Sequence, residues 1–178
     1  MPAEKVVFTS QQIESRVAEL GREISGDYAG RQLLVVGVLA GAFIFTADLV
    51  RVLDLDLAVD FIRISSYGKN TSSSGRVALG KDLDCDIADL EVLLVEDIVD
   101  TGRSLAWLRQ HLLERHPASL RVCALVDKRE RREVEVEIDY TGFRVENGFL
   151  VGYGLDCAGR YRQLPEILEL TSKANTPE

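Results

Sequence analysis

The chain has 178 residues, of which 46% are hydrophobic and 28% are charged, a composition typical of one globular domain spanning residues 1–178. Its formal net charge of −8 argues against nucleic-acid binding, which requires a clustered basic surface. The first residues lack the apolar run of a secretory signal, and apolar stretches such as 33–45 are too short and glycine-interrupted to cross a membrane.

The first half of the chain alternates helical and extended patterns. Ser10 is suited to cap a helix, and Gly26 and Gly30 mark the end of that helix. Its apolar positions recur at helical spacing and are Ile13, Val17, Leu20 and Ile24. The elements predicted next are a buried strand over 33–38, a helix over 42–53, a strand over 57–64 and a polar loop over 65–75.

The second half continues the same alternation. It predicts strands over 92–96 and 121–128, with a helix carrying Leu105, Leu108 and Leu112 between them, and shorter strands over 142–145 and 149–153. Strands that alternate with helices predict an α/β fold with a mostly parallel sheet covered on both faces. Right-handed crossovers place the strand-to-helix loops at one edge of such a sheet, where ligands bind. We expect the tail at 171–178 to be frayed.

The cysteines carry little chemistry in this pattern. Cys85, Cys123 and Cys157 are odd in number, widely spaced and outside any CxxC pair. We expect them to be reduced and buried as small apolar residues, which indicates a cytoplasmic protein.

The segment EDIVDTGRS (Glu96–Ser104) carries the clearest chemical signal, because a buried strand leads through it into a helix. A helix N-terminus offers unpaired N–H groups and the positive end of a dipole, which suits a phosphate. Gly102 permits close approach of the backbone, and the hydroxyl of Thr101 adds a donor. Alternatively, Asp100 or Thr101 only caps the helix. The chain contains no GxxxxGK[ST] motif, so this is not a Walker loop.

Two adjacent carboxylates precede this turn. Glu96 and Asp97 would repel a bare phosphate, so their presence requires another reason. Carboxylates suit ribose hydroxyls and hard cations, and a ligand with ribose, phosphate and magnesium satisfies the whole segment.

VLLVEDIVDTGRSL (Val92–Leu105) resembles the phosphoribosyl-pyrophosphate-binding motif of the type I phosphoribosyltransferases. The form that begins its phosphate loop with Asp100 is similar to the hypoxanthine-guanine phosphoribosyltransferases, and the resemblance extends from about Val36 to Arg162. It implies a mostly parallel twisted sheet flanked by helices, with a small hood formed by terminal segments. It also implies an enzyme of purine salvage that uses Mg²⁺ and transfers a 5-phosphoribosyl group to hypoxanthine or guanine.

The resemblance assigns roles to the central segment. Asp100 would be the general base near the purine N7. Magnesium would be held by Glu96, Asp97 and Asp156. The donor and its 5′-phosphate would be bound by Glu96, Asp97, Asp100, Thr101, Gly102, Arg103 and Ser104.

Other motifs would complete the site. Pyrophosphate would contact Ala40, Gly41 and Arg162, with a Leu39–Ala40 peptide that is often cis in the family. Many relatives carry lysine where this chain has Ala40, so backbone groups must replace that cation. Alternatively, the segment is a plain strand-to-helix turn.

The lid and the purine pocket come from the same resemblance. Ser66 and Tyr67, in the polar loop at 65–75, would close over the reaction centre and exclude water, although composition alone favours a solvated linker. The purine would be bound by Lys128, Phe149 and Leu150, with Phe149 stacking on the ring and Lys128 meeting the 6-oxo group. The two apolar residues could instead belong to the core. We interpret the neighbouring Arg129, Arg131 and Arg132 as a solvated basic turn.

Two other functions fit the same fold. One is a related enzyme that prefers xanthine or acts on pyrimidines, and the other is a non-catalytic regulator that senses nucleotides. We expect a homodimer or homotetramer that binds small molecules rather than nucleic acid or membranes, with the first helix and residues 42–53 as candidate interfaces.

Overall fold

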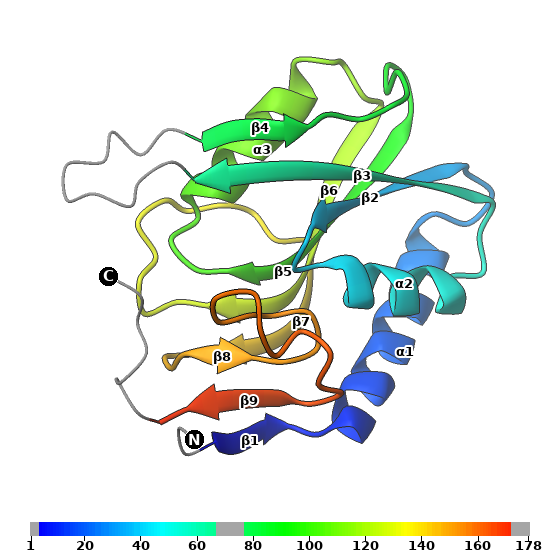
Figure 1. Ribbon diagram of the computed structural model, residues 1–178. Helices are drawn as coiled ribbons and strands as arrows, with labels where there is room; N and C mark the ends of the chain where they lie inside the picture. The colour runs from blue at the N-terminus through cyan, green and yellow to red at the C-terminus, as the bar shows by residue number, and fades with distance from the viewer. Residues whose placement is uncertain (1–3, 67–76, 172–178) are drawn as a thin grey trace.

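The computed structural model describes residues 4–66 and 77–171 and is built around a six-stranded sheet (Figure 1). Its strands lie in the order β4-β3-β2-β5-β6-β7. Their bounds are β2 (Leu33–Leu39), β3 (Leu57–Ser66), β4 (Val77–Lys81), β5 (Glu91–Val99), β6 (Ser119–Lys128) and β7 (Tyr140–Val145). All neighbours are parallel except the edge pair β3–β4. The predicted α/β class is therefore confirmed.

Helices cover both faces of this sheet, as the apolar strands require. Helices α1 (Ser10–Asp27) and α2 (Phe43–Val52) pack on one face, where Leu20 and Phe45 are fully buried. Helix α3 (Arg103–Leu113) packs on the other face through Leu105 and Leu108. Alternate residues of the central strands supply the two cores.

The hood implied by the resemblance is a second, three-stranded antiparallel sheet. Its order is β1-β9-β8, formed by β1 (Glu4–Phe8), β8 (Leu150–Val151) and β9 (Ile167–Leu170) (Figure 1). Phe8 stacks on Phe143 of β7 with ring centroids 4.0 Å apart, so the hood is fixed to the edge of the main sheet. The segment between β8 and β9 packs on the turn after β2, where Gly154 lies against the Gly41 carbonyl.

Two predicted element boundaries were wrong. Thr9, not Ser10, is the N-cap of α1, and it forms a capping box with Gln12. Strand β5 does not end at Glu96 but continues to Val99, because β6 remains paired with it there. The pairing of β5 with β2 ends earlier, at Val95, so the last residues of β5 have a strand on one side only.

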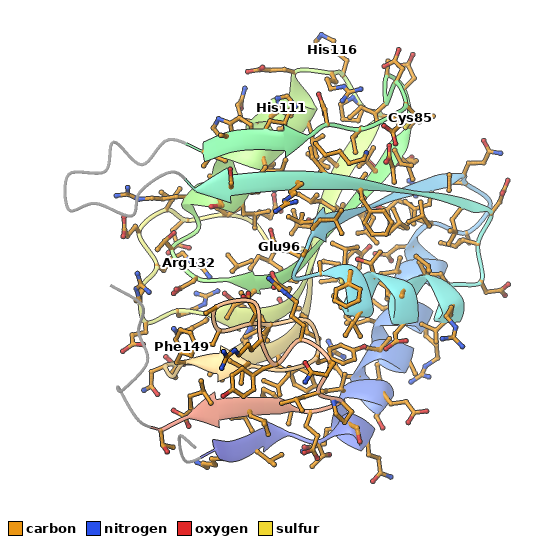
Figure 2. The ribbon with its side chains drawn as sticks, viewed as in Figure 1. Cys85, Glu96, His111, His116, Arg132 and Phe149 are labelled. Atoms are coloured by element: carbon orange, nitrogen blue, oxygen red, sulfur yellow. The ribbon has the colours of Figure 1, made fainter. Side chains whose placement is uncertain are left out.

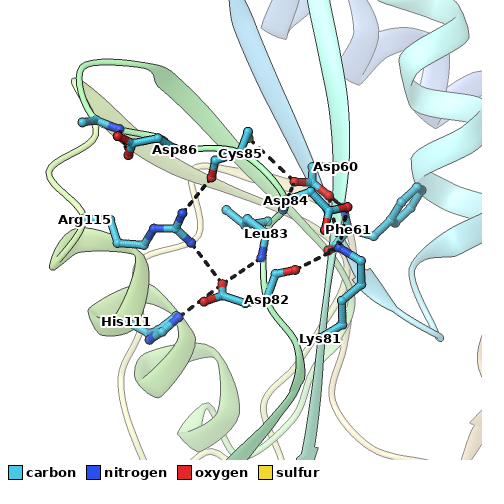
Figure 3. Close-up of polar contacts among 11 residues, drawn as sticks. Asp60, Phe61, Lys81, Asp82, Leu83, Asp84, Cys85, Asp86, His111 and Arg115 are labelled. Carbon is cyan, nitrogen blue, oxygen red and sulfur yellow. Dashed lines mark hydrogen bonds and ion pairs between the residues drawn. The ribbon is translucent and has the colours of Figure 1, made fainter.

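Cys85 also differs from expectation, since it is exposed, whereas Cys123 and Cys157 are buried as predicted. It lies in a polar network that joins the segment after β4 to the end of α3 (Figure 3). Arg115 donates hydrogen bonds to Asp82 Oδ1 (3.0 Å) and to the carbonyl of Cys85 (2.7 Å). The Cys85 thiol in turn lies 3.7 Å from Asp60 Oδ2.

The predicted lid falls largely outside the described residues. Tyr67 lies outside them altogether, and for Ser66 only the backbone, at the end of β3, is described. The tail from 172 onward also lies outside them. Within 4–66 and 77–171, no helix is long and apolar enough to cross a membrane.

Candidate active site

The predicted phosphate loop is the short connection between β5 and α3. Gly102 is the N-cap of α3 and adopts φ 82°, a left-handed conformation that glycine permits without strain. The first intrahelical hydrogen bond runs from the Ala106 amide to the Gly102 carbonyl (2.9 Å), so the preceding first-turn amides have no intrahelical acceptor. The N-cap residue Gly102 has no side chain to cap the helix, but the Thr101 hydroxyl accepts a hydrogen bond from the Arg103 amide (3.4 Å), so the capping alternative is supported for Thr101. The geometry suits an anion.

Asp100 stands at the start of this loop with one carboxylate oxygen available. Its Oδ1 is buried, makes no hydrogen bond to the described residues and lies 3.9 Å from Lys128 Nζ. Its Oδ2 is 3.3 Å from Arg131 Nη1. The structure therefore brings the predicted general base beside the predicted purine-binding lysine, with a proton-accepting oxygen that no protein donor occupies.

Glu96 and Asp97 form a pair of neighbouring acids within β5, and Glu96 is only 7% exposed (Figure 2). Burial, together with the adjacent Asp97 carboxylate, raises the pKa of Glu96 well above its ordinary value. Burial also raises the pKa of Asp97, whereas the Arg162 charge acts in the opposite direction. Two desolvated acids side by side are a suitable place for a cation or for hydroxyl donors.

The predicted pyrophosphate loop touches this pair. The Leu39–Ala40 peptide is cis, as the resemblance implies. The backbone of Gly41 packs directly on the Asp97 carboxylate, leaving no room for a Cβ atom. On its other side, the Gly41 carbonyl packs against Gly154 of the hood segment, which is equally closed to a Cβ atom. Ala40 itself is exposed, so its backbone is open to a ligand.

Arg162 contacts the same group of residues, through Gly154 of the hood segment. It donates a hydrogen bond from Nη1 to the Gly154 carbonyl (2.6 Å), and its Nη2 lies 2.8 Å from Asp156 Oδ1. Asp156 also accepts a hydrogen bond from the Gly159 amide (2.7 Å). Arg162 is thus held near Asp97, while Asp156 is engaged with Arg162 rather than grouped with Glu96 and Asp97. Among the described residues, no group of three or more His, Cys, Asp or Glu side chains could hold a metal ion.

The predicted purine residues differ in exposure. Lys128 ends β6 and is 7% exposed, with its ammonium directed at Asp100. Phe149, by contrast, is 48% exposed beside β8 (Figure 2), which is unusual for a large apolar side chain and leaves its ring open to stacking. Leu150 is buried in the core shared with the hood, so only its backbone is suited to a ligand. Arg103 is paired with Glu133 and is more than half exposed.

Comparison with known proteins agrees with this geometry. A family profile described as a phosphoribosyl transferase domain matches residues 5–158. The chain is 50% identical to the hypoxanthine-guanine phosphoribosyltransferase of Mycobacterium avium over 168 residues, which cover 91% of this chain and 83% of that protein. The chain belongs to the hypoxanthine-guanine phosphoribosyltransferases.

Solved structures of this phosphoribosyltransferase family share the fold. A hypoxanthine-guanine phosphoribosyltransferase from Bacillus anthracis, with a HEPES molecule in its active site, is 41% identical and has a TM-score of 0.89, covering 95% of this chain and 99% of that one. The hypoxanthine phosphoribosyl transferase of Trypanosoma cruzi is 40% identical with a TM-score of 0.89, covering 95% and 92% of the two chains. A role of its C-terminal region in oligomeric state and activity is described for that protein. The predicted family, fold and enzyme class are confirmed.

The contacts of the three arginines that follow Lys128 could not be predicted from the sequence of this phosphoribosyltransferase. The prediction of a solvated turn fits the exposed side chains of Arg129 and Arg131 but is wrong for Arg132. The side chain of Arg132 is only 6% exposed, Arg131 pairs with Asp100, and Arg129 pairs with the buried Asp127. A run of charged residues predicts a solvated turn, and only the contacts with the phosphate loop show which of these arginines is buried.

Proposed function

We propose that the chain transfers the 5-phosphoribosyl group of phosphoribosyl pyrophosphate to hypoxanthine, guanine or both, releasing pyrophosphate. The observation that carries this proposal is a helix N-terminus suited to phosphate beside an Asp100 oxygen that accepts no hydrogen bond from the described residues and lies 3.9 Å from the Lys128 ammonium. A phosphate site, a general base and a donor for a 6-oxo group are the parts that this reaction requires. The names of the relatives support the same substrates.

Donor binding would begin at the phosphate loop. The first-turn amides of α3 and the hydroxyls of Thr101 and Ser104 would bind the 5′-phosphate. Glu96 and Asp97 would accept hydrogen bonds from the ribose hydroxyls or bind them through the metal. At the other end, Arg162 and the backbone at Ala40 and Gly41 would bind the pyrophosphate.

Magnesium fits the acid pair. Without a cation, Glu96 and Asp97 are adjacent, desolvated and raised in pKa, which is the environment that a hard divalent ion relieves. Mg²⁺ is commonly held by one or two carboxylates together with substrate oxygens, so an all-protein cage is not required. When bound, it would supply charge neutralisation for the leaving pyrophosphate. Asp156 would serve a second ion once Arg162 turns to pyrophosphate.

The chemical step is a displacement with inversion at the anomeric carbon. A purine ring nitrogen forms the new C–N bond as the C–O bond to pyrophosphate breaks. Asp100 Oδ1 would accept the proton that leaves purine N7, a contribution of roughly 10²–10⁴-fold to the rate. Lys128 would donate to the 6-oxo group and Phe149 would stack on the ring, while the Leu150 backbone would meet the base edge. Ser66 and Tyr67 would exclude water from the reaction centre.

Assembly and location belong to the same proposal. We expect a cytoplasmic homodimer or homotetramer, with α1 and α2 as candidate interface surfaces. Phe43 and Val52 on α2 are 42% and 43% exposed, and a groove of about 660 Å³ is lined by the two helices and by residues 163–165 before β9. Large apolar side chains at the surface are a feature of subunit interfaces.

A competition assay tests the proposal. Hypoxanthine, guanine and xanthine are mixed with phosphoribosyl pyrophosphate and Mg²⁺, and the nucleotides are separated by chromatography. We expect IMP, GMP or both. Formation of XMP alone would reassign the acceptor, and the absence of any nucleotide would favour the nucleotide-sensing regulator instead.

A further inference from the structure

A turn at residues 129–134, which we call the arginine turn, holds the back of the phosphate loop. The carbonyls of Val99, Asp100 and Thr101 are three consecutive acceptors, and each accepts hydrogen bonds from this turn. The amides of Glu133 and Val134 both donate to the Thr101 carbonyl, at 2.9 and 3.0 Å. The arginine turn thus holds all three carbonyls that precede Gly102.

The side chain of Arg132 contacts two of these three carbonyls. Its Nε donates to the Asp100 carbonyl (3.0 Å), and its Nη2 donates to the Val99 carbonyl (3.1 Å). The same Nη2 donates to the Lys128 carbonyl (3.3 Å) and pairs with Asp127 at 2.5 Å. One buried guanidinium therefore joins the start of the phosphate loop to the end of β6, which carries Lys128 (Figure 2).

Stability alone does not explain this arrangement. Arg132 is 6% exposed and Asp127 is 2% exposed as side chains, and the Nη1 atom of Arg132 has no hydrogen-bond partner among the described residues. A buried ion pair with an unsatisfied donor costs desolvation free energy that a well-packed apolar pair would avoid. The guanidinium is better explained by its planar set of donors, which a smaller or apolar side chain cannot reproduce.

The consequence for the loop follows from peptide geometry. In a planar trans peptide the C=O and N–H bonds point in opposite directions. Because the carbonyls of Asp100 and Thr101 point into the arginine turn, the amides of Thr101 and Gly102 point away from it. Donors for a phosphate are thereby set before the ligand arrives, and preorganised donors bind without a further ordering cost.

We infer that Arg132 is a positioning residue, which orients the phosphate-binding amides and holds Asp100 in register with Lys128. This inference rests on the proposed function, because it takes the 100–104 loop as the 5′-phosphate site. Arg132 touches no substrate in this role and acts through the backbone that it binds.

Arg129 provides the matched control. It pairs with the same buried carboxylate, Asp127 Oδ2, at 3.1 Å, but its side chain makes no contact with the loop carbonyls. If Arg132 were only a counter-ion for Asp127, Arg129→Gln and Arg132→Gln would have similar effects. Arg132→Lys keeps a positive charge near Asp127 but loses the fork that reaches two loop carbonyls.

The test compares ligands with and without the phosphate. Calorimetry measures the binding of IMP and of inosine to the wild-type chain and to the three variants, and steady-state kinetics gives KM for phosphoribosyl pyrophosphate. For Arg132→Gln and Arg132→Lys we expect IMP affinity to fall by about tenfold or more, with inosine affinity nearly unchanged. We also expect KM for the donor to rise and kcat to fall, while Arg129→Gln resembles wild type.

The outcomes separate a positioning role of Arg132 from a role as a simple counter-ion of Asp127. Wild-type IMP affinity in Arg132→Lys, equal losses for IMP and inosine, or the same loss in Arg129→Gln would each overturn the inference. If Arg132→Gln does not unfold cooperatively in a thermal melt, Arg132→Lys alone supplies the comparison. A wild-type chain that binds IMP but forms no nucleotide would defeat the proposed reaction while leaving this test intact.

Discussion

Gly41→Ala tests whether the pyrophosphate loop and the acid pair work as one site. A Cβ atom at position 41 would overlap Asp97 Oδ2 and lie 3.0 Å from Oδ1, whereas ordinary Cβ atoms keep a wider separation. The carboxylate or the loop must therefore shift by about 1–2 Å, and a misplacement of about 1 Å already costs about 10²-fold in rate. Asp97 is only partly buried and can move aside, so the overpacking cost should stay within about 1–3 kcal/mol of unfolding free energy.

The assay varies phosphoribosyl pyrophosphate at saturating hypoxanthine and Mg²⁺. We expect kcat/KM for the donor to fall by about 10²-fold and KM for hypoxanthine to change little, because Lys128 and Phe149 are untouched. Gly26→Ala is the control, since a Cβ atom there meets nothing within 4 Å and alanine favours the helix. Kinetic constants for Gly41→Ala within twofold of wild type would refute the coupling between Gly41 and Asp97.

Four further changes probe separate parts of the chain. Asp100→Asn should lower kcat by roughly 10²–10⁴-fold while calorimetry still detects IMP binding, and near-normal turnover would remove Asp100 from the role of base. Phe149→Ala should weaken purine binding by about 1–3 kcal/mol without changing KM for the donor, and an unchanged KM for purine would exclude stacking. Thr9→Ala should cost about 1 kcal/mol of stability through loss of the capping box, measured by urea unfolding, with activity retained. Because the pKa of Glu96 is raised, the folded state binds more protons than the unfolded state at pH values above the ordinary glutamate pKa. The free energy of unfolding without divalent ions should therefore fall as pH rises. Glu96→Gln should flatten this dependence in urea unfolding at several pH values, and an identical slope would exclude Glu96 as its source.

The sequence predicted the central strands and the phosphate loop because both depend on local patterns. Apolar runs such as 33–38 identify buried strands, and the turn before α3 combines a glycine with hydroxyls at a helix start. Strands β1 and β9 were not predicted, because they are short and pair residues that lie 159 to 166 positions apart, from Phe8–Ile167 to Glu4–Leu170. The cap of α1 was misplaced by one residue, since Thr9 and Ser10 are both good caps and only Thr9 has a glutamine, Gln12, at the third helical position to complete a capping box.

The arginine turn marks a different limit. KRERR has the composition of a solvated loop, and no periodicity separates Arg132 from Arg131 or Arg129. Their fates differ because β6 ends beside β5, which places the turn behind the phosphate loop. Buried Arg132 finds backbone carbonyls, whereas Arg129 remains more than half exposed. A register in the sheet, rather than any local signal, decides which arginine is buried.

The charges around the site reconcile a net charge of −8 with an anionic donor. The local cations Arg131 and Arg162 are paired with Asp100 and Asp156 in the ligand-free chain. Such pairs keep the cations at the site and ordered, at a free-energy cost of separation that is small because both members are partly exposed. In the proposed reaction, the pyrophosphate group of the donor would enter with magnesium, whose positive charge would meet Glu96 and Asp97, and it would compete with Asp156 for Arg162. Under the proposed function, the acids would favour a donor that arrives with its metal and would repel a bare phosphate, which would account for the carboxylates beside the phosphate loop.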